Sequence, residues 1–395
     1  MKLPLLLTLC ATLSALSREN PGPGSAAMQS FVDDKTIAGA VTLIVGKEGI
    51  KSLESTGVKD LETAQPMPKN AMFWIASMTK PMTALAVMML VEEGELSIDD
   101  PVAKHLPEFK NQLLVTEVKD GKTTLQSPAR PVTVKDLLTH TSGLTSRSPL
   151  EPTALDVLTL REATITYGLT PLQSEPGSKW SYCNTGINTL GRIVEVLSGK
   201  PYETFMQERL FTPLGMVDTT FWPTPDHLAR LATTYKPSTS GQGLEKTKIT
   251  YLSGDLSDRK RMPMPAGGLF SCAQDLAHLY QMLLNAGELN GRRYIKAETL
   301  SQMTTNQLGD MQKVSFAPGM QMGLGFHIVH EPQGVTESLS PGSFGHGGAY
   351  GTQAWLDPVR GLAIVLLIQR AGLPNSDGSE MRRALQKAAV EKFTK

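Results

Sequence analysis

Segments with strand-like and helical patterns are unevenly distributed along this chain of 395 residues. Apolar runs typical of strands lie towards its two ends, at 40–45, 50–53, 324–329, 353–356 and 363–369. Segments with an apolar residue at every third or fourth position, typical of helices, fill the middle. Strands so far apart in the chain can share one core if both ends contribute to a single sheet. We therefore predict an α/β (α+β) fold with an antiparallel sheet, flanking N- and C-terminal helices and an inserted, mostly helical domain.

The same distribution predicts two domains. Residues 28–72 and 262–395 would form a discontinuous α/β sheet domain, and residues 73–261 would form the helical domain. Binding sites occur preferentially where two domains meet, so we expect the active site in the cleft between them.

Local signals predict where several helices begin and end. Helical periodicity starts at Ser77. A second helix should end at Gly199, because glycine readily adopts the left-handed conformation that closes helices. Ser271 and Gln274 have the spacing of a capping box, which predicts a third helix there. A last helix is expected from about Ser379.

The first residues have the pattern of a secretory signal peptide. Lys2 precedes an apolar run from Leu3 to Leu16, and the small residues Ala15 and Ser17 then precede a polar stretch. A buried first helix is the alternative. We predict that residues 1–17 are a signal peptide and that the mature protein is secreted or periplasmic.

Composition excludes several classes of partner. Lys plus Arg and Asp plus Glu are equal at 38 each, so no net charge attracts nucleic acid or an anionic membrane. No apolar run after the N-terminus is long enough for a membrane span. The seven histidines and three cysteines show no metal-ligand spacing, and we expect no metal or cofactor. Pairing of Cys183 with Cys272 stays open, as does the oligomeric state.

Ser77 and Lys80 form an S-x-x-K motif at the start of a predicted helix. Residues three apart on a helix share a face, so the amine of Lys80 can reach the Ser77 hydroxyl. Serine becomes a useful nucleophile only when a neighbouring base takes its proton. Lysine can be that base if burial lowers its pKa. A capping serine beside a surface lysine is the alternative.

A second S-x-x-K, Ser257 to Lys260, shows that the motif alone is weak. Its surroundings are charged and have no helical period, so we interpret it as a solvated loop.

Tyr182 and Asn184 lie just before another predicted helix. A tyrosine close to a lysine ammonium can be driven towards phenolate and move a proton. The amide of Asn184 can bond the lysine and a substrate carbonyl together. A core tyrosine next to a helix cap is the alternative. We expect Cys183 to be a packed side chain and His140 to bond the backbone of its loop.

His346, Gly347, Gly348 and Ala349 form a third candidate group. The glycines leave the backbone bare, so a substrate could lie against a strand edge and bond its N–H groups. One of these N–H groups could complete an oxyanion hole with the N–H of Ser77. A glycine-rich hairpin carrying a surface histidine is the alternative.

The order of these groups resembles that of class C β-lactamases and other penicillin-recognising serine hydrolases: Ser77-x-x-Lys80, Tyr182-x-Asn184, then His346-Gly347-Gly348. Similar flanking segments lie at 137–144, 175–177, 213–216 and 266–269. The resemblance spans about residues 28–392. It implies the β-lactamase/DD-peptidase-like fold, a covalent acyl-enzyme on Ser77, and Ala349 as the second oxyanion donor.

The third motif departs from that of class C β-lactamases. They carry Lys-Thr/Ser-Gly, which grips the carboxylate of a β-lactam, where this chain has His346 and Gly347. Histidine is mostly neutral at pH 7, so carboxylate recognition should be weaker. Triplets like this one occur in relatives that resemble family VIII carboxylesterases and D-peptidases.

We therefore predict a carboxylesterase of small or medium esters, with Ser77, Lys80 and Tyr182 as catalytic residues. A β-lactamase or a D-peptidase, such as a DD-carboxypeptidase or D-aminopeptidase, is the alternative, so the partner is a small-molecule ester or amide. An inactive penicillin-binding-type protein is a third hypothesis of another class. The complete set of catalytic groups favours an enzyme.

Overall fold

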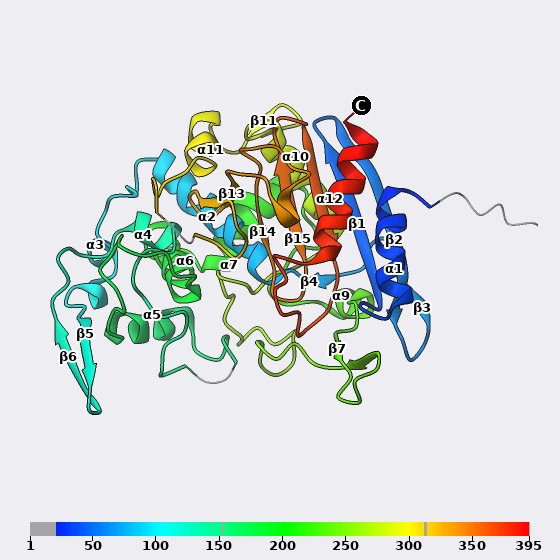
Figure 1. Cartoon of the computed structure of the whole chain (residues 1–395). Helices are drawn as coiled ribbons and strands as arrows, with labels where there is room; N and C mark the ends of the chain where they lie inside the picture. The colour runs from blue at the N-terminus through cyan, green and yellow to red at the C-terminus, as the bar shows by residue number, and fades with distance from the viewer. Residues whose placement is uncertain (1–20, 152–153, 312–313, 395) are drawn as a thin grey trace, which may run out of the picture.

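The computed structural model describes residues 21–151, 154–311 and 314–394. Its main feature is an antiparallel sheet with the strand order β12-β13-β14-β15-β16-β1-β2-β3 (Figure 1). The sheet strands are β1 Gly39–Gly46, β2 Gly49–Asp60, β3 Gln65–Pro66, β12 Met320–Met322, β13 His327–Val329, β14 Phe344–Gly347, β15 Gln353–Asp357 and β16 Leu362–Leu367. β1 pairs with β16, so both ends of the chain build the sheet, as predicted.

The central strands β1 and β16 are buried at every position because both faces of the sheet are covered. In β1, Leu43 belongs to the core on one face, and its neighbour Ile44 belongs to the core on the other. In β16, Val365 and Ile364 divide in the same way. Successive strand residues point to opposite faces, so two layers of helices are needed to bury these runs.

The two terminal helices pack together over one face of the sheet. They are α1 Pro23–Asp33 and α12 Glu380–Phe393, drawn in blue and red in Figure 1. α10 Ala273–Leu284 contacts β1 and β16 and belongs to the other face's core. The flanking terminal helices are therefore confirmed.

The remaining helices lie mostly to one side of the sheet (Figure 1). They are α2 Thr79–Glu92, α3 Val102–His105, α4 Val134–Leu138, α5 Leu160–Leu169, α6 Asn184–Ser198, α7 Tyr202–Met206, α8 Thr212–Leu214, α9 Pro225–Arg230 and α11 Ala297–Met303. Short single turns are η1 Ala76–Met78, η2 Pro107–Phe109, η3 Gln207–Phe211 and η4 Gly334–Thr336. Two-stranded pairs are β4 Phe73–Trp74 with β9 Phe270–Ser271, β5 Leu114–Lys119 with β6 Lys122–Gln126, β7 Tyr235–Pro237 with β8 Leu244–Lys246, and β10 Glu288–Leu289 with β11 Arg292–Arg293.

Several local predictions are confirmed and two are wrong. α6 ends before Gly199, which has a φ of 67°, and Ser379 caps α12. The capping box at Ser271 is wrong, because Ser271 lies in β9 and its hydroxyl bonds Thr219. The run 324–329 is not one strand, since a turn at Gly325 (φ 79°) precedes β13.

Three further expectations concern organisation. Among the described residues, no helix is both long and apolar enough to cross a bilayer. The signal peptide predicted at 1–17 lies outside the described residues. The division at 73 and 261 stays a prediction, and Tyr235, from inside that range, bridges to Arg370 directly after the sheet.

Both cysteines of the described chain are free thiols and buried. We therefore expect a reductant to leave the melting temperature unchanged. Alkylation followed by mass spectrometry should modify Cys183 and Cys272 only after unfolding in denaturant. A melting temperature that falls on reduction would contradict the structure.

Candidate active site

Ser77 lies in the tight turn η1, immediately before α2. The expectation that the helix itself starts at Ser77 is therefore off by two residues. Ala76 has a φ of 46°, a left-handed conformation that costs a non-glycine residue energy. Thr79 holds this turn, because its hydroxyl donates to the Ala76 carbonyl at 2.7 Å. The serine is thus presented on a strained turn fixed from the first residue of α2.

Lys80 is completely buried and reaches Ser77, as the motif predicts. Its Nζ lies 3.0 Å from Ser77 Oγ, 2.8 Å from Asn184 Oδ1 and 2.6 Å from the Ala266 carbonyl. The last two partners are acceptors only. A neutral amine has two N–H groups for them and one lone pair left for the Ser77 hydroxyl.

The electrostatics favour that neutral form. Burial lowers the pKa of Lys80 from 10.5 to about 7, although Cys183 and Asp377 act in the opposite direction. Near neutral pH a large fraction of Lys80 can therefore accept the Ser77 proton.

Tyr182 stands beside both groups. Lys80 Nζ lies 4.6 Å from the centre of the Tyr182 ring, and the Tyr182 hydroxyl shares a hydrogen bond with Ser77. Burial raises the pKa of Tyr182 well above 10, and the bond to Ser77 only partly offsets this. The phenolate expected from the sequence is therefore disfavoured. Tyr182 is placed to donate and relay a proton, and Lys80 is the better base.

His140 fixes the position of Tyr182 from both sides. Its carbonyl accepts the N–H of Ser181 at 2.8 Å, and its Nδ1 accepts the N–H of Cys183 at 3.2 Å. This confirms that His140 bonds loop backbone. Cys183 is packed as expected and also accepts the N–H of Gly186, which caps α6.

A cluster of aromatic and histidine rings, of which His327 and His346 are buried, packs around Tyr182, and sequence reasoning missed most of it. The ring of Phe316 lies 5.0 Å from that of Tyr182, and His346 lies 6.0 Å from it. His327 packs against His346 at 4.8 Å, and Trp180 lies 6.2 Å from His327. Residues from four separate segments meet here, so no spacing along the chain could have indicated the cluster.

His346 is buried and bonds the backbone of its own segment. It is 3% exposed, and its Nδ1 donates to the Gly347 carbonyl at 2.7 Å. Burial, followed by the nearby His327, lowers the pKa of His346 well below 6.5. The assignment of His346 as a substrate-binding residue stays a prediction. The neutral charge expected for it is supported by this lowered pKa.

The two glycines allow close approach of other segments: Gly348, directly after β14, faces the residues at η1, and Gly347 faces the segment before α12. A side chain on Gly348 would meet the Ile75 carbonyl at 2.6 Å, and one on Gly347 would meet Asp377 at 2.1 Å. The N–H of Gly348 donates to the Thr352 carbonyl at 2.7 Å. Of the four residues in this motif, only Ala349 lines the cavity next to Ser77.

A cavity of about 170 Å³ opens beside Ser77. Its lining residues come from both of the predicted domains: Trp74, Ala76, Ser77, Leu155, Tyr182, Asn184, Tyr251, Met264, Ala266, Gly267 and Ala349. None of these lining residues is a lysine or an arginine. Trp74, Leu155, Tyr251 and Met264 carry no signal in the sequence that relates them to Ser77.

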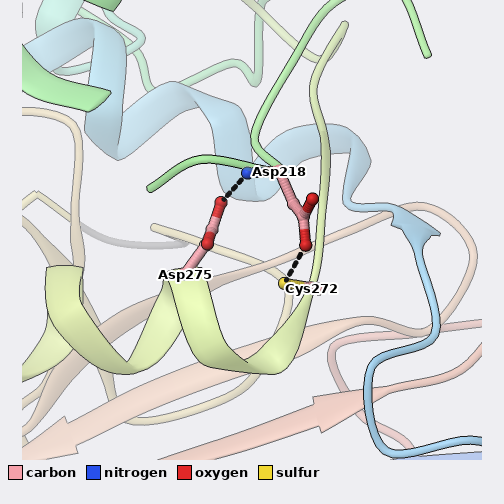
Figure 2. A group of neighbouring side chains, drawn as sticks. All are labelled: Asp218, Cys272 and Asp275. Carbon is pink, nitrogen blue, oxygen red and sulfur yellow. Dashed lines mark hydrogen bonds between the residues drawn. The ribbon is translucent and has the colours of Figure 1, made fainter. Parts of the chain in front are cut away.

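Other candidate groups are structural. The Ser257 hydroxyl donates to Asp255 in an exposed turn, which confirms the second S-x-x-K as a loop. Asp218, Cys272 and Asp275 also form a close group (Figure 2). Arg230 pairs with Asp218 at 2.6 Å, and Asp275 accepts the N–H of Asp218. These bonds occupy oxygens that a metal would need, so we assign the group a structural role.

Comparisons with known proteins identify the family and the fold. A family model described as Beta-lactamase matches residues 25–389. The chain belongs to the beta-lactamase family. Esterase EstB of Burkholderia gladioli is 28% identical over 363 residues, which is 86% of this chain and 87% of EstB. Lovastatin esterase of Penicillium rubens is 30% identical over 323 residues, 77% of this chain and 78% of that relative.

Solved structures show that the fold is that of the beta-lactamase family. EstCE1, described as a hydrolase with promiscuous acyltransferase activity, has a TM-score of 0.77 and 24% identity, covering 93% of this chain and 97% of its own. Simvastatin synthase LovD from Aspergillus terreus has a TM-score of 0.80 and 22% identity, and the match covers 95% of this chain and 100% of the LovD chain. The protein is a serine hydrolase of this fold with esterase-like relatives.

The low pKa of Lys80 gives a test of its role as base. Only the neutral amine can accept a proton, so kcat/KM for a neutral ester should rise with pH through about 7 and then level off. Lys80→Arg should lower kcat by on the order of 100-fold, because arginine stays protonated. Lys260→Arg, in the exposed second motif, is the matched control. An active Lys80→Arg variant would exclude lysine as the base.

Proposed function

We propose that the protein is a carboxylesterase that forms an acyl-enzyme on Ser77. Neutral Lys80 takes the Ser77 proton as Oγ attacks the ester carbonyl. The N–H groups of Ser77 and Ala349 hold the resulting oxyanion. Tyr182 relays this proton from the Lys80 ammonium to the oxygen of the departing alkoxide, which leaves as the alcohol. Water then attacks the acyl-enzyme by the reverse proton route, which releases the acid and restores Ser77.

The observation that carries this proposal is the buried, hydrogen-bonded contact between Lys80 Nζ and Ser77 Oγ. It supplies the base that a serine nucleophile needs. Asn184 orients the amine through its Oδ1 and lines the cavity, so it can also bond the substrate. A protein that only binds its ligand does not need a buried amine hydrogen-bonded to a serine hydroxyl.

The cavity favours neutral esters over anionic β-lactams. A carboxylate usually needs a cation or several donors, and no lining residue is lysine or arginine. The nearby His346 is kept neutral by burial and is not among the residues that line the cavity. A D-peptide carboxylate meets the same difficulty. We also propose export, which rests on the signal-peptide pattern of residues 1–17.

The nucleophile can be identified by covalent labelling. A fluorophosphonate probe should modify the peptide that contains Ser77, since the probe requires an activated serine. Ser77→Ala should abolish labelling and ester turnover, whereas Ser257→Ala should retain both. Labelling of Ser257 or Ser142 in the wild type would overturn the assignment.

Substrate class is tested by comparing kcat/KM for p-nitrophenyl butyrate, a chromogenic cephalosporin and a D-alanyl-D-alanine peptide. Loss of one charge-assisted bond to the carboxylate corresponds to roughly 1.5–3 kcal/mol, so we expect the ester to be favoured by about tenfold or more. A wild type that prefers the cephalosporin or the peptide would show that the protein is a β-lactamase or a D-peptidase instead.

A further inference from the structure

One wall of the cavity beside Ser77 is built from two loops that are far apart in the sequence but in contact in the structure. Leu155 precedes α5, and Tyr251 belongs to the long segment before α10. The N–H of Leu155 donates to the Tyr251 carbonyl at 2.9 Å, which joins the loops. Tyr251 is 44% exposed, so this wall stands at the mouth of the cavity.

The joint between the loops is maintained by a buried ion pair. Asp156 is fully buried and Arg261 is 4% exposed, and Arg261 Nε donates to Asp156 Oδ2 at 2.7 Å. The other carboxylate oxygen accepts the N–H of Ser253 at 2.8 Å. The Asp156 carbonyl also accepts the N–H of Met262 at 2.9 Å. One aspartate therefore bonds its partner loop at three places.

Arg261 extends these bonds to further segments. It donates to the Leu256 carbonyl at 2.6 Å, and its own carbonyl accepts the indole N–H of Trp222 at 3.1 Å. Both ions thus have hydrogen-bond partners in addition to each other. Removing one partner of such a pair leaves an uncompensated buried charge and is strongly destabilising. Each ion therefore depends on the other to remain in place.

The other end of the wall is anchored independently of this pair. The N–H of Thr250 donates to the Tyr350 hydroxyl at 3.1 Å. The Tyr350 ring packs edge-on against Trp74 at 4.9 Å, and Tyr251 lies 6.0 Å from Trp74. Loss of the ion pair should therefore loosen Leu155 and the mouth while the floor at Trp74 stays in place.

The size and polarity of the cavity limit what can fill it. An apolar cavity of about 150 Å³ holds a molecule the size of benzene, which has six carbons. The cavity of about 170 Å³ here offers Trp74, Leu155, Tyr251 and Met264 as apolar walls next to Ser77. It fits a neutral acyl group of up to roughly six carbons, and the further carbons of a longer chain must pass the Leu155–Tyr251 wall at the mouth.

We propose that the Asp156–Arg261 ion pair is a positioning pair that fixes the Leu155–Tyr251 wall and so sets the upper limit on acyl-chain length. This inference rests on the proposed esterase function. Neither ion touches Ser77, Lys80 or Tyr182, so the pair acts on which esters fit and leaves the proton transfers alone.

The test measures kcat and KM for p-nitrophenyl acetate, butyrate, hexanoate and octanoate. For the wild type, kcat/KM should be highest with the short-chain esters and should be lower by about tenfold or more with octanoate. Asp156→Asn keeps the size of the side chain but removes its charge. It should raise the octanoate-to-butyrate ratio of kcat/KM by about tenfold, mainly through KM. Leu155→Ala, which widens the wall without touching the pair, should change the ratio in the same direction.

Controls separate positioning from a general loss of structure. Asp258→Asn, an exposed aspartate in the same loop, should leave the chain-length profile unchanged. Fluorophosphonate labelling of Ser77 should stay within about threefold of the wild type in Asp156→Asn and Arg261→Lys, because neither residue lines the cavity or belongs to the catalytic groups. If Asp156→Asn does not fold, Arg261→Lys keeps the charge and loses the planar fork, and should give an intermediate ratio.

Two results would overturn the inference, and they differ from failure of the esterase assignment. The first is an Asp156→Asn variant whose kcat is lower by the same factor for all four esters, so that the dependence of kcat/KM on acyl-chain length is unchanged. The second is a rate that depends on the length of the alcohol in a series of alkyl acetates rather than on the acyl chain. Failure of the esterase assignment would instead appear as a wild type that turns over none of these esters.

Discussion

The active site is organised around a buried, desolvated amine. Lys80 is buried between Ser77, Asn184 and the Ala266 carbonyl, and its pKa falls from 10.5 to about 7. A difference of this size corresponds to roughly 5 kcal/mol against the charged form. The segments that supply the three partners must therefore meet around Lys80. The same burial that disfavours the ammonium makes lysine a base at neutral pH.

Much of the site could be predicted because its chemistry is local in sequence. Ser77 and Lys80 are one turn apart, and Asn184 follows Tyr182 by two residues, so short motifs carry their relative positions. The glycines of the third motif were recognisable as a motif, but their physical reason is a distant contact, because a side chain at Gly348 would collide with the Ile75 carbonyl. The antiparallel sheet followed from the position of the apolar runs in the same way.

The parts that could not be predicted depend on contacts between distant segments. Phe316 lies in the segment before β12 and His327 in β13, and they gain their relation to Tyr182 only when these segments fold against the turn before α6. Asp156 and Arg261 are ordinary charged residues in the sequence, and only their burial distinguishes them. The error at Ser271 has the same origin, since pairing of β9 with β4 took precedence over a local capping signal. Periodicity describes one segment at a time and does not contain this information.

The pairing of β1 with β16 has a consequence for how the protein is made. Thr352 bonds the Ile75 carbonyl across 277 positions, directly beneath the turn that carries Ser77. During synthesis the nucleophile and its base emerge long before the strand that completes their surroundings. Contacts over such separations form slowly, because a long loop must close first. An incomplete chain therefore has exposed apolar strand edges and no finished catalytic centre, and hydrolytic activity can arise only after the last strands have been added.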